Sequence, residues 1–230
     1  MRRAEGVREL LDGPVAPADL AASLDDLDRL NAWFGGYALT LARVRHAAAA
    51  LPRDRALVVV DVGGGRGDFA RRLVRLARRD GWRVAVVVVD RDPATVAFAG
   101  AACAAYPEIS VVRADVTALP LREAAADVAT ASLTLHHLEP DDAVSALAEM
   151  AFAARRVIVN DLLRTRASLA LVWLVTRVLA MHPMSRHDGP LSVRRAYTAD
   201  ELGALAEKAR IAPLRIRRHP LLGRLVAETP

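Results

Sequence analysis

Cysteine is nearly absent from this sequence, because Cys103 is the only one in 230 residues. A single cysteine cannot form an intramolecular disulfide, and it excludes a cysteine-rich zinc site and a Cys-x-x-Cys redox pair. The first six residues lead into charged positions instead of an apolar stretch, which predicts no secretory signal. We therefore expect a protein that works in the reducing cytoplasm.

Lysine and aromatic side chains are also scarce. Lys208 is the only lysine among 32 basic residues, against 27 acidic ones, and Phe, Trp and Tyr together make up 4% of the chain. The reliance on arginine suggests a GC-rich genome, which raises the isoelectric point without selecting for nucleic acid. Because the arginines are scattered and few aromatics could stack on bases, the composition predicts no nucleic-acid partner.

Long hydrophobic runs and internal repeats are missing as well. The most apolar stretch, residues 163–181, has only ten residues between Arg166 and Arg177, well short of the about 20 that span a bilayer. The sequence therefore predicts no transmembrane segment. Hydrophobic residues nevertheless make up 53% of the chain, which is enough for a substantial core.

Two patterns alternate after Pro52. Short runs rich in β-branched residues are typical of strands buried on both faces of a parallel sheet, and they occur at 57–62, 84–89, 109–112, 128–133 and 156–159. Helix-like stretches lie between them at 68–79, 93–105 and 140–153. This alternation predicts the α/β class, with a doubly wound, mostly parallel sheet.

The two ends of the chain depart from this alternation. Before Pro52, leucines at three- and four-residue steps and a second apolar stretch predict an N-terminal helical segment, residues 1–51, ahead of a main domain of residues 52–230. Near the other end, helices are predicted at 163–181 and 199–208. Residues 214–217 and 222–227 then predict a terminal hairpin, which completes a seven-stranded sheet.

A glycine-rich loop follows the first predicted strand. It reads Asp61-x-Gly63-x-Gly65-x-Gly67, and glycine at a strand-to-helix turn lets the backbone and its free N–H groups approach a ligand. The dinucleotide fingerprint G-x-G-x-x-G would need a glycine at position 68, which is Asp68. The spacing therefore disfavours a nicotinamide oxidoreductase.

Polar residues end the next three predicted strands as well. Asp90 follows Gly67 by 23 residues, Asp115-Val116 ends the third strand, and Ser132 lies on the fourth, shortly before a pair of histidines. In this order the four elements resemble the class I S-adenosylmethionine-dependent methyltransferases over residues 57–160. The resemblance implies their Rossmann-like fold and S-adenosylmethionine as cofactor.

The resemblance also assigns roles to individual residues. The glycine loop would wrap the methionine part of the cofactor, Asp90 would accept the ribose hydroxyls, and Asp115 with the following N–H would contact adenine. Helix capping or a structural turn is the alternative for each acid and for the loop. The implied cofactor-binding residues are Asp61, Gly63, Gly65, Gly67, Asp90, Arg91, Asp115, Val116 and Ser132.

The methyl acceptor is predicted to be a small molecule. The Asn/Asp-Pro-Pro-aromatic box of nucleic-acid amino-methyltransferases does not occur, whereas residues 184–197, with Asn160-Asp161 and the segments 9–12 and 30–31, resemble a bacterial subgroup found with type III polyketide synthases. That resemblance implies O-methylation of a phenolic or polyketide-type hydroxyl. C-methylation of an aromatic or quinol ring and an inactive binding module are the alternatives.

A phenol ionises near pH 10, so its attack on a methyl group at neutral pH benefits from a base such as histidine. His187 is the first candidate, followed by His137 and His136, although His187-Asp188 could instead shape a turn before Gly189-Pro190. We predict no metal site. Adjacent histidines on a strand would point to opposite faces, and only Asp161 and Asp188 offer themselves as carboxylate ligands.

The apolar stretch between the fifth strand and the terminal hairpin commonly forms a lid in this fold. We expect such a lid at about 161–198, with Leu171, Trp173 and Val175 contacting an apolar substituent on an aromatic acceptor. Core packing or the interface of a homodimer is the alternative interpretation.

Overall fold

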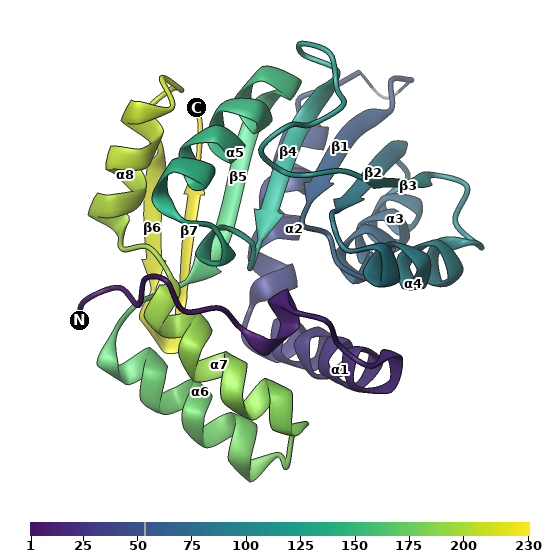
Figure 1. The fold of residues 1–230 in the computed structure, drawn as a ribbon. Helices are drawn as coiled ribbons and strands as arrows, with labels where there is room; N and C mark the ends of the chain where they lie inside the picture. The colour runs from purple at the N-terminus through teal and green to yellow at the C-terminus, as the bar shows by residue number, and fades with distance from the viewer. Residues whose placement is uncertain (53) are drawn as a thin grey trace.

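Runs of buried valine and alanine build the centre of this protein. The computed structural model describes residues 1–52 and 54–230, and its described strands form one seven-stranded sheet in the order β3-β2-β1-β4-β5-β7-β6 (Figure 1). The parallel strands are β1 (Leu57–Val62), β2 (Val84–Asp90), β3 (Ile109–Arg113), β4 (Ala126–Ser132) and β5 (Ala154–Leu162). The hairpin strands β6 (Arg215–His219) and β7 (Arg224–Glu228) run antiparallel, so the predicted fold is confirmed.

Alternate residues of the central strands face two separate hydrophobic cores. Val59 of β1 packs with α2 (Gly36–Ala49) and α3 (Asp68–Asp80), while its neighbour Val60 packs with α5 (Pro140–Ala153) and α8 (Ala199–Lys208). Helix α4 (Pro93–Cys103) packs against β2 and β3. Burial on both faces explains why these strands carry apolar runs instead of alternating with polar residues.

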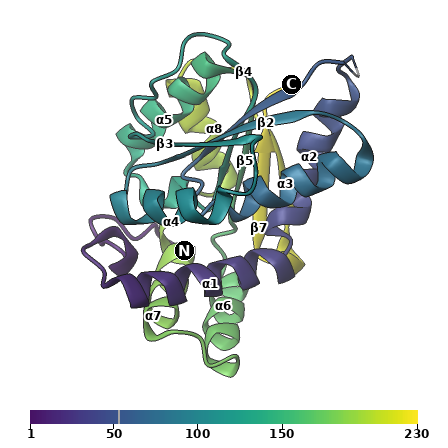
Figure 2. The same cartoon turned by 90° about the vertical axis from the view of Figure 1, so that its right-hand side faces the viewer.

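Three further helices gather beyond the carboxyl ends of the parallel strands. Helices α6 (Arg166–Val178) and α7 (Pro183–Arg195) pack on each other, and α1 (Pro17–Trp33) packs against α7 and α2 (Figures 1 and 2). The two N-terminal helices therefore have different neighbours, since α2 covers the sheet and α1 lies with the inserted pair. Short 3₁₀ helices complete the chain, namely η1 (Leu10–Asp12), η2 (Leu135–His137) and η3 (Pro220–Leu222).

Helix α7 was not predicted, because Gly189-Pro190 is typical of a turn. The structure instead runs one helix through both residues, with Pro183 at its first turn and the His182 side chain accepting a hydrogen bond from the Met184 N–H. A Cβ atom at Gly189 would lie 2.9 Å from Val172 Cγ1. Close packing of α6 on α7 therefore accounts for this glycine, and tertiary contacts override the local turn preference.

Helix α6 is shorter than the predicted 163–181. Thr165 caps it, because the Thr165 hydroxyl accepts a hydrogen bond from the Ser168 N–H at 3.0 Å. Within residues 1–52 and 54–230, no helix has the length and apolar character needed to cross a membrane, in agreement with the spacing of the two arginines.

Candidate active site

A cavity of about 610 Å³ opens at the carboxyl ends of the parallel strands. Its walls come from the glycine loop, the ends of β2 and β4, the N-terminal residues 8–13, α1, α6 and α7. All but one of the residues predicted to bind the cofactor line it: Asp61, Gly63, Gly65, Asp90, Arg91, Asp115, Val116 and Ser132.

Gly65 and Gly67 serve different purposes in the loop. Gly67 does not line the cavity, and a Cβ atom there would lie 2.7 Å from Cys103 Sγ, so this glycine allows close packing beneath the loop. Gly65 has φ +56°, and apart from its own chain neighbours no heavy atom of the described residues lies within 4 Å of the Cβ it would carry. Its open side is the cavity, which leaves room for a ligand against the backbone.

The two strand-end acids differ in their environments. Asp90 accepts hydrogen bonds from the Gly65 N–H at 3.1 Å and the Asp92 N–H at 3.0 Å, and burial raises its pKa. Asp115 accepts from the N–H and hydroxyl of Thr117, at 2.9 and 2.7 Å. Neither acid caps a helix as the alternative interpretation expected, since Asp92 caps α4 and no described helix lies between Asp115 and β4, and both acids line the cavity.

Asp61 is buried under the glycine loop. Its Oδ1 accepts a hydrogen bond from the Thr130 hydroxyl at 3.0 Å, while Oδ2 has no hydrogen-bond partner among the described residues. Burial raises the pKa of Asp61 to about 7. A buried carboxylate oxygen without a partner is costly unless a ligand satisfies it.

This shift predicts a pH-dependent stability. The folded protein holds the Asp61 proton more tightly than the unfolded chain, whose Asp pKa is about 3.9, so this group's contribution is complete below pH 4 and is lost as the pH rises through about 7. Relative to Asp61→Asn, the wild type should therefore lose about 1 to 4 kcal/mol between pH 5 and pH 8. Urea denaturation of both ligand-free proteins measures this, and parallel pH profiles would contradict the assignment.

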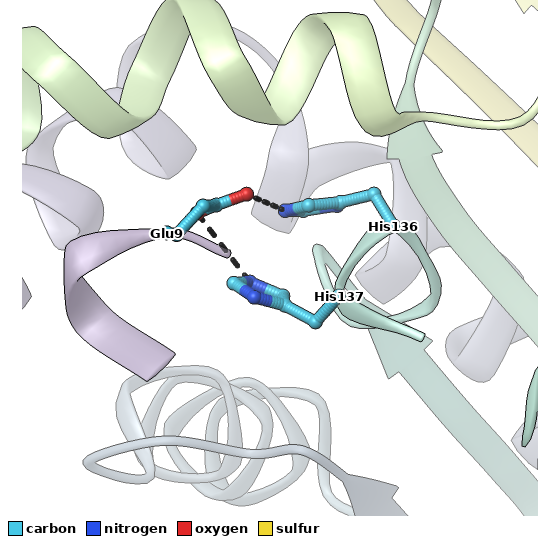
Figure 3. A group of neighbouring side chains, drawn as sticks. All are labelled: Glu9, His136 and His137. Carbon is cyan, nitrogen blue, oxygen red and sulfur yellow. Dashed lines mark ion pairs between the residues drawn. The ribbon is translucent and has the colours of Figure 1, made fainter. Parts of the chain in front are cut away.

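The two adjacent histidines lie on η2, not on a strand. Their ring centroids are 4.3 Å apart, and both rings point toward Glu9 of the N-terminal segment (Figure 3). His136 Nε2 lies 3.7 Å from Glu9 Oε1, and His137 Nε2 lies 3.9 Å from Glu9 Oε2. The premise that these histidines point to opposite faces was wrong, because a 3₁₀ turn replaces the extended backbone.

The opposite ring nitrogen of each histidine is bonded to an aspartate. His136 Nδ1 lies 2.6 Å from Asp161 Oδ1, and His137 Nδ1 lies 2.9 Å from Asp12 Oδ1. Although burial alone would raise both carboxyl pKa values, the neighbouring histidines lower them, that of Asp12 to about 2. Because ionised carboxylates only accept hydrogen bonds, this network assigns the imidazole protons to Nδ1 and leaves Nε2 as the basic atom.

Glu9 completes the cluster from the N-terminal segment. It is 4% exposed, and burial raises its pKa to about 7. Its position is fixed from α7, because the Asp188 carboxylate accepts hydrogen bonds from the N–H groups of Leu10 and Leu11 at 2.9 and 3.0 Å. We refer to Glu9, His136 and His137 as the Glu-His-His cluster.

Buried arginine holds the histidine turn in place. The Arg195 guanidinium, 2% exposed, donates to the carbonyls of His136 at 2.9 Å and His137 at 2.7 Å, and also to the Val7 carbonyl. The Arg3 guanidinium and the Tyr197 hydroxyl both donate to the Leu138 carbonyl. These bonds tie the N-terminal segment to η2, so the two parts of the cluster are held in one arrangement.

His187, the first candidate for the base, lies elsewhere. Its side chain is 54% exposed, its Nδ1 lies 2.8 Å from Asp188 Oδ1, and it does not line the cavity. Its neighbour Asp188 lines the cavity and caps η1. The structure thus brings His136 and His137 to the cavity and leaves His187 outside, while sequence reasoning missed Glu9 and Asp12 as members of the site.

The apolar wall is formed by part of α6. Leu171, Val172 and Val175 line the cavity, whereas Trp173 is 48% exposed and its ring lies against the Arg177 guanidinium, 4.3 Å from the ring centroid. The expectation that Trp173 contacts the acceptor was therefore wrong, while Leu171 and Val175 lie where they were expected.

Part of the sequence is similar to known methyltransferases. Residues 59–156 match the family described as "Methyltransferase domain". The chain is 38% identical over 96 residues to ribosomal RNA small subunit methyltransferase H of Bordetella avium, covering 42% of this chain and 26% of that protein. It is 30% identical over 116 residues to a Mycobacterium tuberculosis protein named "Probable S-adenosylmethionine-dependent methyltransferase", covering 50% of this chain and 37% of that protein. The chain therefore spans well under half the length of these curated relatives.

Solved structures share the fold over most of the chain. A SAM-dependent methyltransferase from Aquifex aeolicus superposes with a TM-score of 0.64 at 18% identity, covering 94% of this chain and 98% of that one. The CMeT domain of the citrinin polyketide synthase gives 0.60 at 13% identity, with 79% and 48% covered. The mitomycin 7-O-methyltransferase gives 0.54 at 23% identity, with 83% and 53% covered. Residues 59–156 thus match a methyltransferase domain, and the chain shares the fold of these solved methyltransferases, in line with the motifs.

Proposed function

We propose that this protein transfers a methyl group from S-adenosylmethionine to a small aromatic acceptor, most directly to a phenolic hydroxyl. The observation that carries this proposal is one cavity with two unlike halves. One half is the glycine loop with the strand-end acids, and the other combines the Glu-His-His cluster with the apolar wall of α6. A methyltransferase needs both halves in one space, because the methyl donor and the acceptor must meet.

The loop half suits the cofactor. Asp61 Oδ2 is buried and unsatisfied within the described chain, and Gly65 presents open backbone to the cavity. Asp90 would accept the ribose hydroxyls, and Asp115 with the Val116 N–H would hold the adenine. When bound, S-adenosylmethionine supplies an activated sulfonium methyl group, so the protein has to position the acceptor and help it lose a proton.

The other half suits an acceptor with an acidic hydroxyl. His136 and His137 line the cavity, and His137 is the more accessible, with 20% of its side chain exposed against 3% for His136. We propose that this cluster promotes proton loss from the hydroxyl, which then displaces the methyl group in a single in-line step without a covalent enzyme intermediate. The resemblance to the polyketide-associated subgroup supports a phenolic or polyketide-type acceptor.

The test is methyl transfer from labelled S-adenosylmethionine to a panel of alkylated phenols, quinols, fatty acids and short RNA oligonucleotides. We expect label in the phenols, with the new methyl on oxygen by NMR of the product. Label on a ring carbon would replace O-methylation by C-methylation. Label in RNA alone, which the Bordetella avium relative makes worth including, would overturn the small-molecule acceptor.

The apolar wall predicts a preference for alkylated rings. Each buried methylene contributes roughly 0.8 kcal/mol, so kcat/KM should rise over the first several carbons of a homologous series of alkylphenols. Val175→Ala should flatten that slope because Val175 lines the cavity, whereas Trp173→Ala on the outer face of the same helix is the matched control and should leave it unchanged. A flat series in the wild type would contradict an apolar acceptor subsite.

A further inference from the structure

The Glu-His-His cluster has the donor set of a metal site. Glu9, His136 and His137 each offer one ligand atom, and these atoms all lie within 4.8 Å of one another (Figure 3). Imidazole with one carboxylate suits divalent zinc, iron, cobalt and nickel. The two Nε2 atoms lie 3.7 and 3.9 Å from different oxygens of Glu9. Neighbouring ligands of an ion with bonds of about 2.1 Å lie roughly 3.0 to 3.4 Å apart, so the three side chains would have to contract around the ion.

The hydrogen-bond partners of the two histidines also support a metal site. The Nδ1 atom of each histidine is hydrogen-bonded to an aspartate, Asp161 for His136 and Asp12 for His137. Both Nε2 atoms remain free to bind an ion and lie near Glu9. Carboxylate-bound histidines are the usual outer support of a metal centre, because the aspartate fixes the ring and makes the free nitrogen a better ligand. In this protein two such Asp-His pairs lie beside the same glutamate, Glu9.

One carboxylate oxygen of Glu9 is left without a hydrogen bond among the described residues. Glu9 is 4% exposed, and its Oε1 has no hydrogen-bond partner in the part of the chain that the structure describes. Asp12 and Asp188 add further negative charge beside Glu9, and Asp161 adds negative charge beside His136. A buried carboxylate that has one unsatisfied oxygen and faces two imidazole nitrogens would be stabilised by a cation.

We infer that the Glu-His-His cluster binds one divalent transition-metal ion of the zinc type. The three ligands line the cavity, so further coordination positions remain open to water or to an acceptor hydroxyl. Resting on the proposed function, the inference assigns to this ion the acidification of that hydroxyl, since a metal-bound oxygen loses its proton at a lower pH. The hydroxyl proton leaves to solvent, and the resulting oxyanion keeps its electron pair for attack on the methyl group.

Calorimetry with Zn²⁺ on the full chain, after treatment with a chelator, tests this site without any assay of activity. We expect one equivalent bound, with an affinity at least about tenfold lower in both Glu9→Gln and His137→Gln. His46→Gln removes an exposed histidine of α2 far from the cluster and is the matched control. Cobalt(II) should give a visible d–d absorption band that the two cluster variants lose.

The outcomes separate the two proposals. Loss of Zn²⁺ binding in both cluster variants, with S-adenosylmethionine binding and thermal midpoint retained, supports the metal site whether or not an acceptor is found. No stoichiometric Zn²⁺ binding, or binding that Glu9→Gln and His137→Gln leave unchanged, overturns it. Methyl transfer that persists in fully metal-free protein would keep the proposed function and overturn the role assigned to the ion.

Discussion

Gly65→Val should weaken binding of S-adenosylmethionine by more than about 100-fold. Gly65 lies in the cavity wall with φ +56°, and the Cβ position it leaves empty opens into the cavity. A branched side chain there would fill cofactor space and strain a left-handed backbone, and a loss of about 2.7 kcal/mol corresponds to that factor. Equilibrium dialysis with labelled cofactor measures the effect.

A valine at a second glycine, Gly81, serves as a control for the effect of backbone strain alone. Gly81 ends α3 with φ +72°, and it too has open surroundings within the described structure, but it does not line the cavity. Gly81→Val should cost a similar amount of stability and leave cofactor affinity within about twofold. If both variants lost binding equally, the glycine loop would not be the cofactor site.

His137→Ala should lower turnover by about 10² to 10⁴ while cofactor affinity stays near that of the wild type. His137 lines the cavity, and its Nδ1 is held by Asp12 at 2.9 Å, so removal takes away a positioned group that promotes proton loss. Raising the pH should restore part of the rate, because it supplies the acceptor as its oxyanion. Steady-state kinetics from pH 6 to pH 10 measure both effects.

His187→Ala provides the comparison, since local sequence made His187 the first candidate. The structure places its half-exposed side chain outside the cavity lining, so we expect most of the turnover to remain. A large loss in His187→Ala with little change in His137→Ala would reverse this assignment and return the base to α7.

The cofactor half of the site could be predicted because its signals are local. Asp61 and Asp90 lie in the last residues of apolar strands, and Asp115 follows the next strand. The carboxyl ends of parallel strands meet at one edge of the sheet. The spacing of Gly63, Gly65 and Gly67 is likewise local, because all three glycines lie in one strand-to-helix turn. The alternation of strands and helices predicted the doubly wound sheet, and residues 214–217 and 222–227 predicted the terminal hairpin.

The acceptor half could not be predicted in the same way, because its members meet only in the folded chain. Asp12 and His137 are 125 positions apart, and Glu9 joins them through a segment fixed by Asp188 of α7. Because Gly189-Pro190 predicted a turn, α7 was not recognised as a helix. Helical periodicity could therefore not be used to show that Asp188 lines the cavity and His187 does not. Trp173 was wrongly expected to contact the acceptor because residues 169–175 of α6 are all apolar. Such a run does not reveal which face of the helix is buried.

Calorimetry of the full chain with S-adenosylmethionine shows whether the cavity at the strand ends binds this cofactor. We predict one equivalent bound per chain, with affinity weakened about 5- to 150-fold in Asp90→Ala, the equivalent of about 1 to 3 kcal/mol for ribose hydroxyls left without a charged partner. Absence of binding by the folded wild-type protein, or undiminished affinity in Asp90→Ala, would contradict the account.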